Sequence, residues 1–149
     1  MFGFIIALVS GALMSIQGVF NTEVTKQSST WTTSTFVQAT GFLACLIVWF
    51  VTEREQSFTM LLKVSPKYLL LGGIIGAAIT FTVIKSVASL GPAQSAMLIV
   101  ASQSVVSYLI EVFGLFGVEK TGFAWIKLLG VVLFVAGLLI FNLNHKYLL

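Results

Sequence analysis

Residues 2–20 read FGFIIALVSGALMSIQGVF and contain no charged side chain. A helix that crosses the hydrocarbon core of a bilayer needs about 20 mostly apolar residues. This stretch therefore predicts a membrane-spanning helix. It lacks the basic segment and the clear small-residue cleavage site that mark a secretory signal peptide. We expect it to be retained as the first helix of the protein.

Four further apolar runs follow, at about residues 33–51, 68–88, 93–116 and 125–143. Together the five runs predict an all-α membrane protein with five transmembrane helices in a single domain, residues 1–149. The second run is the least apolar, because its first half is rich in Ser and Thr. Such a half-helix is tolerated where it faces protein or a water-filled cavity. A four-span alternative would leave residues 40–51 unexplained.

The composition favours a surface that faces lipid over a fold that is soluble in water. Hydrophobic residues make up 58% of the chain, charged residues only 9%, and the mean hydropathy is +1.04. A soluble domain carries about 25% charged residues. The net charge of +3 comes from Lys and Arg residues that are scattered singly between apolar runs. Because they form no basic patch, we expect no nucleic-acid partner.

The residues that carry chemistry are too few for an enzyme. There is no Asp, and Cys45 and His145 are single residues of their kinds. A disulfide, a serine triad, a zinc site and an aspartyl dyad are therefore excluded within one chain. No phosphate-binding loop and no GxSxG sequence occurs. We expect a protein that is not an enzyme and that uses no cofactor and no metal.

Basic residues indicate the orientation of the chain in the membrane. With five spans, the side that holds the N-terminus carries five of them: Arg54, Lys63, Lys67, Lys120 and Lys127. The other side carries three: Lys26, Lys85 and Lys146. The positive-inside rule favours an N-terminus in the cytoplasm by this narrow margin. If copies insert in both directions, an odd number of spans makes them an inverted pair across two chains.

The fourth run carries the clearest candidate for a functional site. Glu111 lies well before its expected end, and ionisable residues inside a span are costly and therefore functional candidates. On a helix, Ser104, Ser107 and Glu111 lie near one face. Tyr108 lies beside them, and Gln103 adds an amide one turn from Ser107. This pattern predicts a polar stripe along a pathway, with Glu111 as a cation or proton site.

A second interpretation of Glu111 has equal weight. Its carboxylate would lie near the end of the span, where it reaches the interface or pairs with Lys120 or Lys127. The sequence leaves the two interpretations open. For Lys85, toward the end of the third run, we expect the long stem to carry the ammonium group to the interface.

A second polar stripe follows the first run. It consists of Ser10, Met14, Gln17 and Asn21, at spacings i, i+4, i+7 and i+11. Gln17 is the deepest of them and would meet a substrate near the midplane. The alternative role is an interhelical hydrogen bond, which contributes about 0.6–2 kcal/mol in membranes. Both roles stay open.

Glycines mark two small faces. Gly72 and Gly76 are one turn apart in the third run, and Gly130 and Gly137 are two turns apart in the fifth. Small faces permit close approach of helices. Packing within one chain and packing between two copies are both compatible with this pattern.

Four stretches, taken in order, resemble one family of transporters. The first is GALMSIQGVFN at residues 11–21, where a Gln and an Asn are four residues apart. The second is the tight turn LGPA at residues 90–93. The third joins ASQ at 101–103 to EVFGLFG at 111–117, and the fourth is the segment 127–139, from KLLG to AGLL. In this order the chain resembles the drug/metabolite transporter superfamily, and within it the five-span YdcZ-like inner-membrane branch.

The resemblance implies a secondary active exporter of a small organic molecule in the bacterial inner membrane. It implies alternating access by two five-span units, either an antiparallel homodimer or a pair with a separately encoded inverted homologue. Small dimeric relatives in the superfamily exchange organic cations for protons through a glutamate in the first helix. This chain has Gln17 near that depth, so that role is not carried over to this position. Glu111, where Asp would be equally expected, is the remaining candidate for a carboxylate that couples transport to protons.

The residues and the resemblance together predict one site between the two copies. Its substrate-binding residues are expected to be Gln17, Asn21, Gln103, Ser107 and Glu111. Glu111 is also expected to couple transport to a proton or ion. The other expected partners are the lipid bilayer and a small-molecule substrate. Two rival functions stay open: a non-transporting accessory module for a larger partner protein, and a channel.

Overall fold

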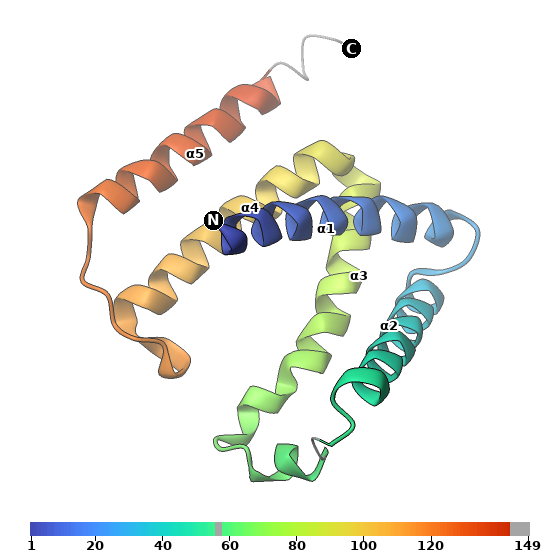
Figure 1. The fold of residues 1–149 in the computed structure, drawn as a ribbon. Helices are drawn as coiled ribbons and strands as arrows, with labels where there is room; N and C mark the ends of the chain where they lie inside the picture. Colours follow the sequence, from blue (N-terminus) through green and yellow to red (C-terminus); the bar gives the residue numbers. More distant parts are fainter. Residues whose placement is uncertain (56–57, 144–149) are drawn as a thin grey trace. The chain divides into compact units, whose positions relative to one another are not determined.

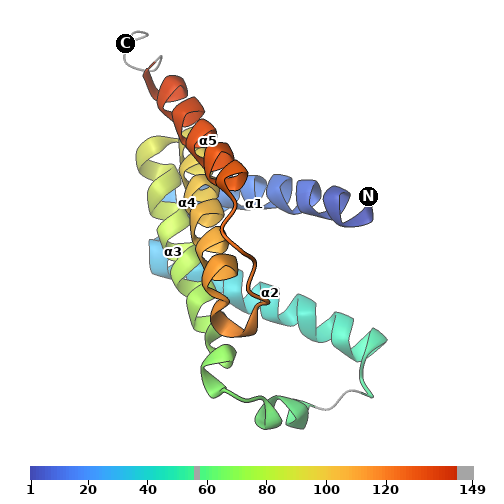
Figure 2. The ribbon, with the colours of Figure 1, turned by 90° about the vertical axis from the view of Figure 1, so that its left-hand side faces the viewer.

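The computed structural model describes residues 1–55 and 58–143, and every regular element in them is helical (Figure 1 and Figure 2). Five α-helices follow each other along the chain: α1 (Phe2–Lys26), α2 (Thr30–Thr52), α3 (Gly72–Leu90), α4 (Pro92–Phe113) and α5 (Trp125–Leu143). Three short 3-10 helices lie in the connections: η1 (Phe58–Lys63), η2 (Lys67–Leu71) and η3 (Leu115–Gly117). The predicted all-α class is confirmed.

Four helical segments are long and apolar enough to cross a membrane. They are α1, α2, α4 and the segment Lys67–Leu90, which η2 and α3 form together. Helix α5 is shorter in its apolar part, which covers Trp125–Phe141. A bilayer is spanned by about 17–25 residues, depending on tilt. The described chain therefore has four clear spans and a fifth, shorter one.

Large apolar side chains cover the outside of the helices. Among the residues that the structure describes, the buried hydrophobic ones are Ile84 and Leu138, whereas Phe4 and Ile126 are 70% and 78% exposed. A soluble domain would bury many such side chains in one core. Lipid tails are as apolar as these side chains, so exposure to a bilayer carries no penalty. The surface therefore agrees with the composition: the chain is suited to lipid.

The chain divides into two compact units, Met1–Leu90 and Gly91–Leu149. The first unit holds α1, α2 and α3, each of which packs on the other two. Gly18 lies where α1 meets α3, and a Cβ at this position would be 3.4 Å from Val83 Cγ1 and 3.6 Å from Val87 Cγ2. The second unit holds α4 and α5. The single domain of residues 1–149 stays a prediction.

Aromatic and small residues join α2 to α3 in the first unit. Trp31 stacks on Phe81, with ring centroids 4.7 Å apart. Lys85 Nζ lies 5.8 Å from the centroid of the same Phe81 ring, within the range of a cation–π contact. Gly76 is close to Gln38, since an added Cβ would be 3.6 Å from Gln38 Nε2. The Gly76 part of the predicted small face thus serves packing within one chain.

Helix α1 runs to Lys26, beyond the expected end of the first run at residue 20. Two hydroxyl groups in its last turns donate back to the helix. Thr22 Oγ1 donates to Gly18 O at 2.8 Å, and Thr25 Oγ1 donates to Asn21 O at 2.8 Å. The hydroxyl groups are thus satisfied within the helix, and α1 continues through the polar residues that follow the first run.

Helix α2 begins at Thr30, before the expected residue 33, because Ser29 caps it. Ser29 Oγ accepts a hydrogen bond from Thr32 N at 3.2 Å, and the Ser29 backbone is extended. A serine in this position satisfies one of the free N–H groups of the first turn. The connection between α1 and α2 is therefore only Gln27–Ser29 long.

Helix α4 ends at Phe113, before the expected residue 116. Gly114 adopts the left-handed conformation (φ 65°), and its N–H donates to Ile110 O. This is a common helix stop, and it favours glycine. Thr121 N donates to Glu111 O at 3.0 Å and folds the following segment back on the helix end. As a result, Glu111 lies in the last turn of α4 and not well inside a span, which corrects the expectation.

Candidate functional site

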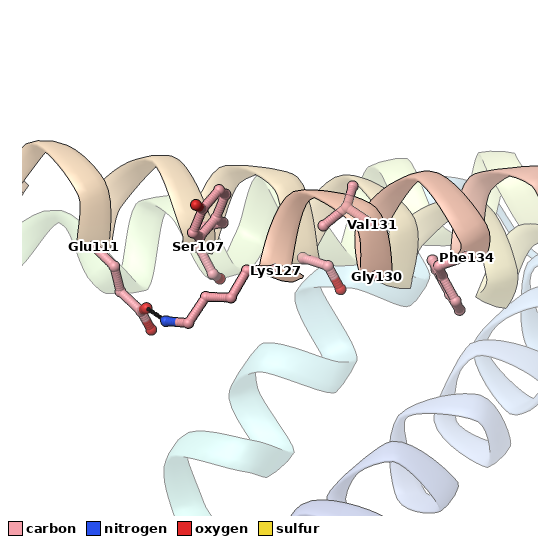
Figure 3. A pocket seen from close by; sticks show the side chains of 8 residues that line it. Ser107, Glu111, Lys127, Gly130, Val131 and Phe134 are labelled. Carbon is pink, nitrogen blue, oxygen red and sulfur yellow. Dashed lines mark hydrogen bonds and ion pairs between the residues drawn. The ribbon is translucent and has the colours of Figure 1, made fainter. Parts of the chain in front are cut away.

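An open groove lies between α4 and α5 in the second unit (Figure 3). Its volume is about 380 Å³. Side chains of α4 and α5 line it: Ser104, Ser107, Tyr108, Glu111, Lys127, Gly130, Val131 and Phe134. Figure 3 shows Glu111 and Lys127 at one end and Phe134 at the other. The groove is therefore charged at one end and apolar at the other.

The charged end is an ion pair between the two helices. Lys127 Nζ donates to Glu111 Oε2 at 3.0 Å, and the side chains are 48% and 43% exposed, respectively. In water, a pair this exposed stabilises a fold by only about 0–1 kcal/mol. Near a membrane interface each charge alone is costly, which favours the paired state more strongly. Of the two lysines proposed from the sequence, Lys127 is the partner of Glu111.

Tyr108 determines where α5 begins. Its hydroxyl group accepts a hydrogen bond from Ala124 N at 3.0 Å and donates one to Ala124 O at 3.2 Å. Ala124 O in turn accepts from Lys127 N at 3.0 Å, in the first turn of α5. The Tyr108 ring also lies 5.7 Å from Lys127 Nζ. Tyr108 thus positions both the backbone and the ammonium group of Lys127.

Aromatic rings support this contact. Phe123 lies between Tyr108, at a centroid distance of 6.2 Å, and Trp125, at 5.0 Å in an edge-to-face arrangement. Such pairs add to the stabilisation that burial alone provides. Trp125 is 76% exposed, as is typical of an aromatic residue at a membrane interface. The rings hold the segment before α5 against the end of α4.

The structure brings two of the five predicted site residues into the groove. Ser107 and Glu111 line it together, as the helical stripe predicted. Gln103 is exposed on α4 and does not line the groove. Gln17 is exposed and Asn21 is buried, and both belong to α1 in the first unit. The substrate-binding role of all five residues stays a prediction.

Sequence reasoning missed most of the α5 wall. The sequence indicates Lys127 as a possible ion-pair partner of Glu111 but not as part of a binding surface, and it indicates no role for Val131 and Phe134. These residues and Gly130 follow the i, i+3, i+4, i+7 spacing of one helix face. The spacing could have indicated a common face, but nothing in the sequence says that this face meets the polar stripe of α4.

Asn21 lies beside a separate cluster of hydroxyl groups in the first unit. Thr33 Oγ1 lies 2.9 Å from Thr25 Oγ1 and 3.0 Å from Ser28 Oγ, both hydrogen-bond distances. Thr33 is 1% exposed, Asn21 8% and Ser34 3%. These contacts join the end of α1 to the start of α2. The interhelical role predicted for Gln17 stays a prediction, because these contacts involve residues outside the first stripe.

Within residues 1–55 and 58–143, no group of three or more His, Cys, Asp or Glu side chains could hold a metal ion. Glu111 has a lysine as its close charged neighbour. The groove thus offers one carboxylate, one ammonium group and hydroxyl groups for binding an organic molecule.

The fold and the groove define a multi-pass helical membrane protein with a polar site between two apolar helices. Residues 2–140 match the family described as "Putative inner membrane exporter, YdcZ". The chain belongs to this YdcZ-like family of the drug/metabolite transporters, as its sequence resemblance indicated. It is a multi-pass protein of the inner membrane, and the description of its family is that of an exporter. No curated protein and no solved structure matches the chain.

Proposed function

We propose that this protein is a secondary active exporter of a small organic molecule that works by alternating access as an inverted dimer. The observation that supports it most directly is the groove between α4 and α5. It places an ion pair and hydroxyl groups between helices that are otherwise suited to lipid. Ionisable groups that face a neighbouring helix at the end of a span, and are paired there, are candidates for substrate or ion contact.

The polar residues of the groove have separate roles in the proposal. Glu111 supplies the charge that couples transport to a proton or ion, and Ser107 supplies a hydrogen bond to the substrate. Ser104 lies one turn before Ser107 on the same wall. Lys127 neutralises Glu111 when the groove is empty, at 3.0 Å. The empty site therefore carries no net charge. This lowers the free-energy cost of the conformational change that turns the empty site from one side of the membrane to the other.

Exposed amide groups and the distribution of basic residues support the inverted dimer in this proposal. Gln17 on α1 and Gln103 on α4 expose their amide groups on apolar helices. An amide group in hydrocarbon needs a partner. A second copy, or a separately encoded inverted homologue, would supply that partner and place Gln17, Asn21 and Gln103 along one pathway. The narrow difference in basic residues between the two sides favours insertion in both directions.

The test is a transport assay in proteoliposomes under a pH gradient. A panel of organic cations, zwitterions and neutral metabolites is offered to the wild type, to Glu111→Gln and to Glu119→Gln. Glu119 is an exposed carboxylate in the connection before α5 and does not line the groove, so its variant is the matched control. We expect saturable transport that Glu111→Gln abolishes and Glu119→Gln preserves.

Other results would change the assignment in defined ways. Saturable transport that survives Glu111→Gln would keep the exporter and reduce Glu111 to a structural anchor. Ion flux without saturation would indicate the channel instead. If no compound of the panel is transported and a larger protein co-purifies, the accessory module would be indicated.

A further inference from the structure

The ion pair in the groove has a consequence for the kind of molecule that binds there. We propose that the groove selects zwitterions, that is, molecules with one cationic nitrogen and one carboxylate close together, and an apolar substituent. The inference rests on the proposed transport function and names the substrate class of that same groove. It is carried by the placement of Glu111, Lys127 and the apolar wall of α5.

The two charges make the groove unfavourable for singly charged molecules. A monocation that approaches Glu111 meets the ammonium group of Lys127, which lies 3.0 Å from the carboxylate. A monoanion that approaches Lys127 meets Glu111 at the same distance. Charges this close still interact appreciably when they are about half exposed, as this pair is. Each singly charged ligand therefore gains one attraction and suffers one repulsion, and it leaves one protein charge without a partner.

A zwitterion avoids this conflict because it can replace the ion pair on both sides. Its cationic nitrogen pairs with Glu111, and its carboxylate pairs with Lys127. The exchange keeps every charge paired, and so avoids the free-energy cost of a charge that is removed from water without a partner. Both side chains are about half exposed, so they can separate without rearrangement of a packed core. Lys127 is additionally held near the Tyr108 ring at 5.7 Å, which keeps its ammonium group at the groove.

The rest of the groove accommodates an uncharged substituent. Beyond the ion pair, the α5 wall continues with Gly130, Val131 and Phe134 (Figure 3). A Cβ added at Gly130 would meet no atom within 4 Å, so the absence of a side chain there leaves open space. Ser107 supplies a hydroxyl group on the opposite wall. This gradient from charged to apolar matches a small zwitterion with an aliphatic or aromatic group.

The test compares binding of matched probes to purified full-length protein by calorimetry. For each of three side-chain sizes, the probes are a free amino acid (alanine, leucine or phenylalanine), its methyl ester and its N-acetyl derivative. At pH 6 these probes are a zwitterion, a monocation and a monoanion, respectively. An α-amino group titrates about one to two units above this pH, and an α-carboxyl group about two units or more below it. We expect the wild type to bind at least one free amino acid about tenfold or more tightly than its two derivatives, a difference of about 1.4 kcal/mol.

The charge variants provide a readout that a purely structural ion pair would not give. Lys127→Gln should shift the preference to the methyl ester, because the repulsion of monocations is removed. Glu111→Gln should shift it to the N-acetyl derivative. Lys120→Gln removes a lysine that lies outside the groove and should leave the wild-type preference unchanged. Unfolding temperature and gel filtration profile in detergent show whether each variant is folded.

Several results would overturn the inference. One is a wild type that binds a methyl ester as tightly as its amino acid, and another is a pair of folded variants without any switch of preference. Binding of none of the probes, combined with saturable transport of another compound, would overturn the zwitterion class and leave the exporter standing. Absence of saturable transport for any compound would instead remove the proposed function, and the zwitterion class with it.

Discussion

Tyr108 holds both backbone groups of Ala124, accepting from its N–H at 3.0 Å and donating to its carbonyl oxygen at 3.2 Å. Ala124 immediately precedes α5, so this side chain of α4 sets the start of the next helix. The pair Glu111–Lys127 lies one turn further along the same two helices. The geometry of the candidate site therefore depends on a contact that involves no charge.

Tyr108→Phe should loosen this contact while keeping the ring. Two hydrogen bonds are lost, each worth about 0.5–1.5 kcal/mol, so we expect the free energy of unfolding to fall by about 1–3 kcal/mol. Transport should show a higher KM, because Lys127 is less well placed. Denaturant unfolding in detergent and transport kinetics measure the two effects. Phe123→Leu, which keeps both hydrogen bonds, is the control and should change KM less; equal KM values for the two variants would refute the positioning role.

Gly114→Ala should destabilise the end of α4. Gly114 has φ 65°, and an added Cβ would lie 3.2 Å from Lys120 Cβ. The left-handed conformation costs a residue with a side chain about 1–2 kcal/mol, and we expect a loss of this size in unfolding free energy. Gly122→Ala is the control, since a Cβ there meets nothing within 4 Å. It should change stability by less than about 0.5 kcal/mol. Equal effects of the two variants would show that the helix stop does not require glycine.

Gly18→Leu should push α1 away from α3. A Cβ at Gly18 already lies 3.4 Å from Val83 Cγ1, so a larger side chain has no room without a shift of the helix. Overpacking of this kind costs about 1–3 kcal/mol. Gly11→Leu on the same helix meets nothing within 4 Å and should be close to neutral. Unfolding of both variants in detergent measures the difference, and an unaffected Gly18→Leu would contradict the α1–α3 contact.

The hydroxyl groups of Thr33 and Ser34 should behave in opposite ways. Thr33→Val removes the hydroxyl group that Thr25 and Ser28 contact at 2.9 and 3.0 Å, so we expect a loss of about 1–3 kcal/mol. Ser34 Oγ is buried and has no hydrogen-bond partner within the described residues. Ser34→Ala therefore removes a desolvation cost and should be neutral or stabilising. Thermal unfolding of the two variants compares their stabilities. A stabilising Thr33→Val would contradict a stabilising role of the hydroxyl cluster.

Insertion in both directions should be visible by labelling from one side of the membrane. In a Cys45→Ser background, Ser28→Cys places a thiol in the exposed connection between α1 and α2. A membrane-impermeant maleimide applied to spheroplasts should label part of this population, and permeabilisation should label the rest. Complete labelling from outside, or none, would exclude dual topology for this protein. Glu119→Cys, in the connection before α5, should label to the complementary extent if α2, the segment Lys67–Leu90 and α4 each cross the membrane.

The membrane class, the number of apolar runs and the family could be predicted from the sequence. Hydropathy is a sum over neighbouring residues, so a run such as residues 2–20 indicates a membrane-spanning helix without any knowledge of tertiary contacts. The helical stripe was also predictable in part, because Ser107 and Glu111 share a face through the helical period alone. Both residues line the groove. The exact helix ends were harder to predict from the sequence, because they depend on contacts such as that of Thr121 N with Glu111 O at 3.0 Å.

The choice of Lys127 as partner of Glu111 was beyond the sequence. The two residues are 16 positions apart on different helices, and Lys120 was an equal candidate. Gly114 ends α4 early, the chain folds back through Thr121, and Tyr108 fixes Ala124 at the start of α5. Local patterns determined that this chain belongs in a bilayer, because they depend only on neighbouring residues. The charged groove arises from tertiary contacts, because an ion pair exists only where the packing of two helices brings its members within reach.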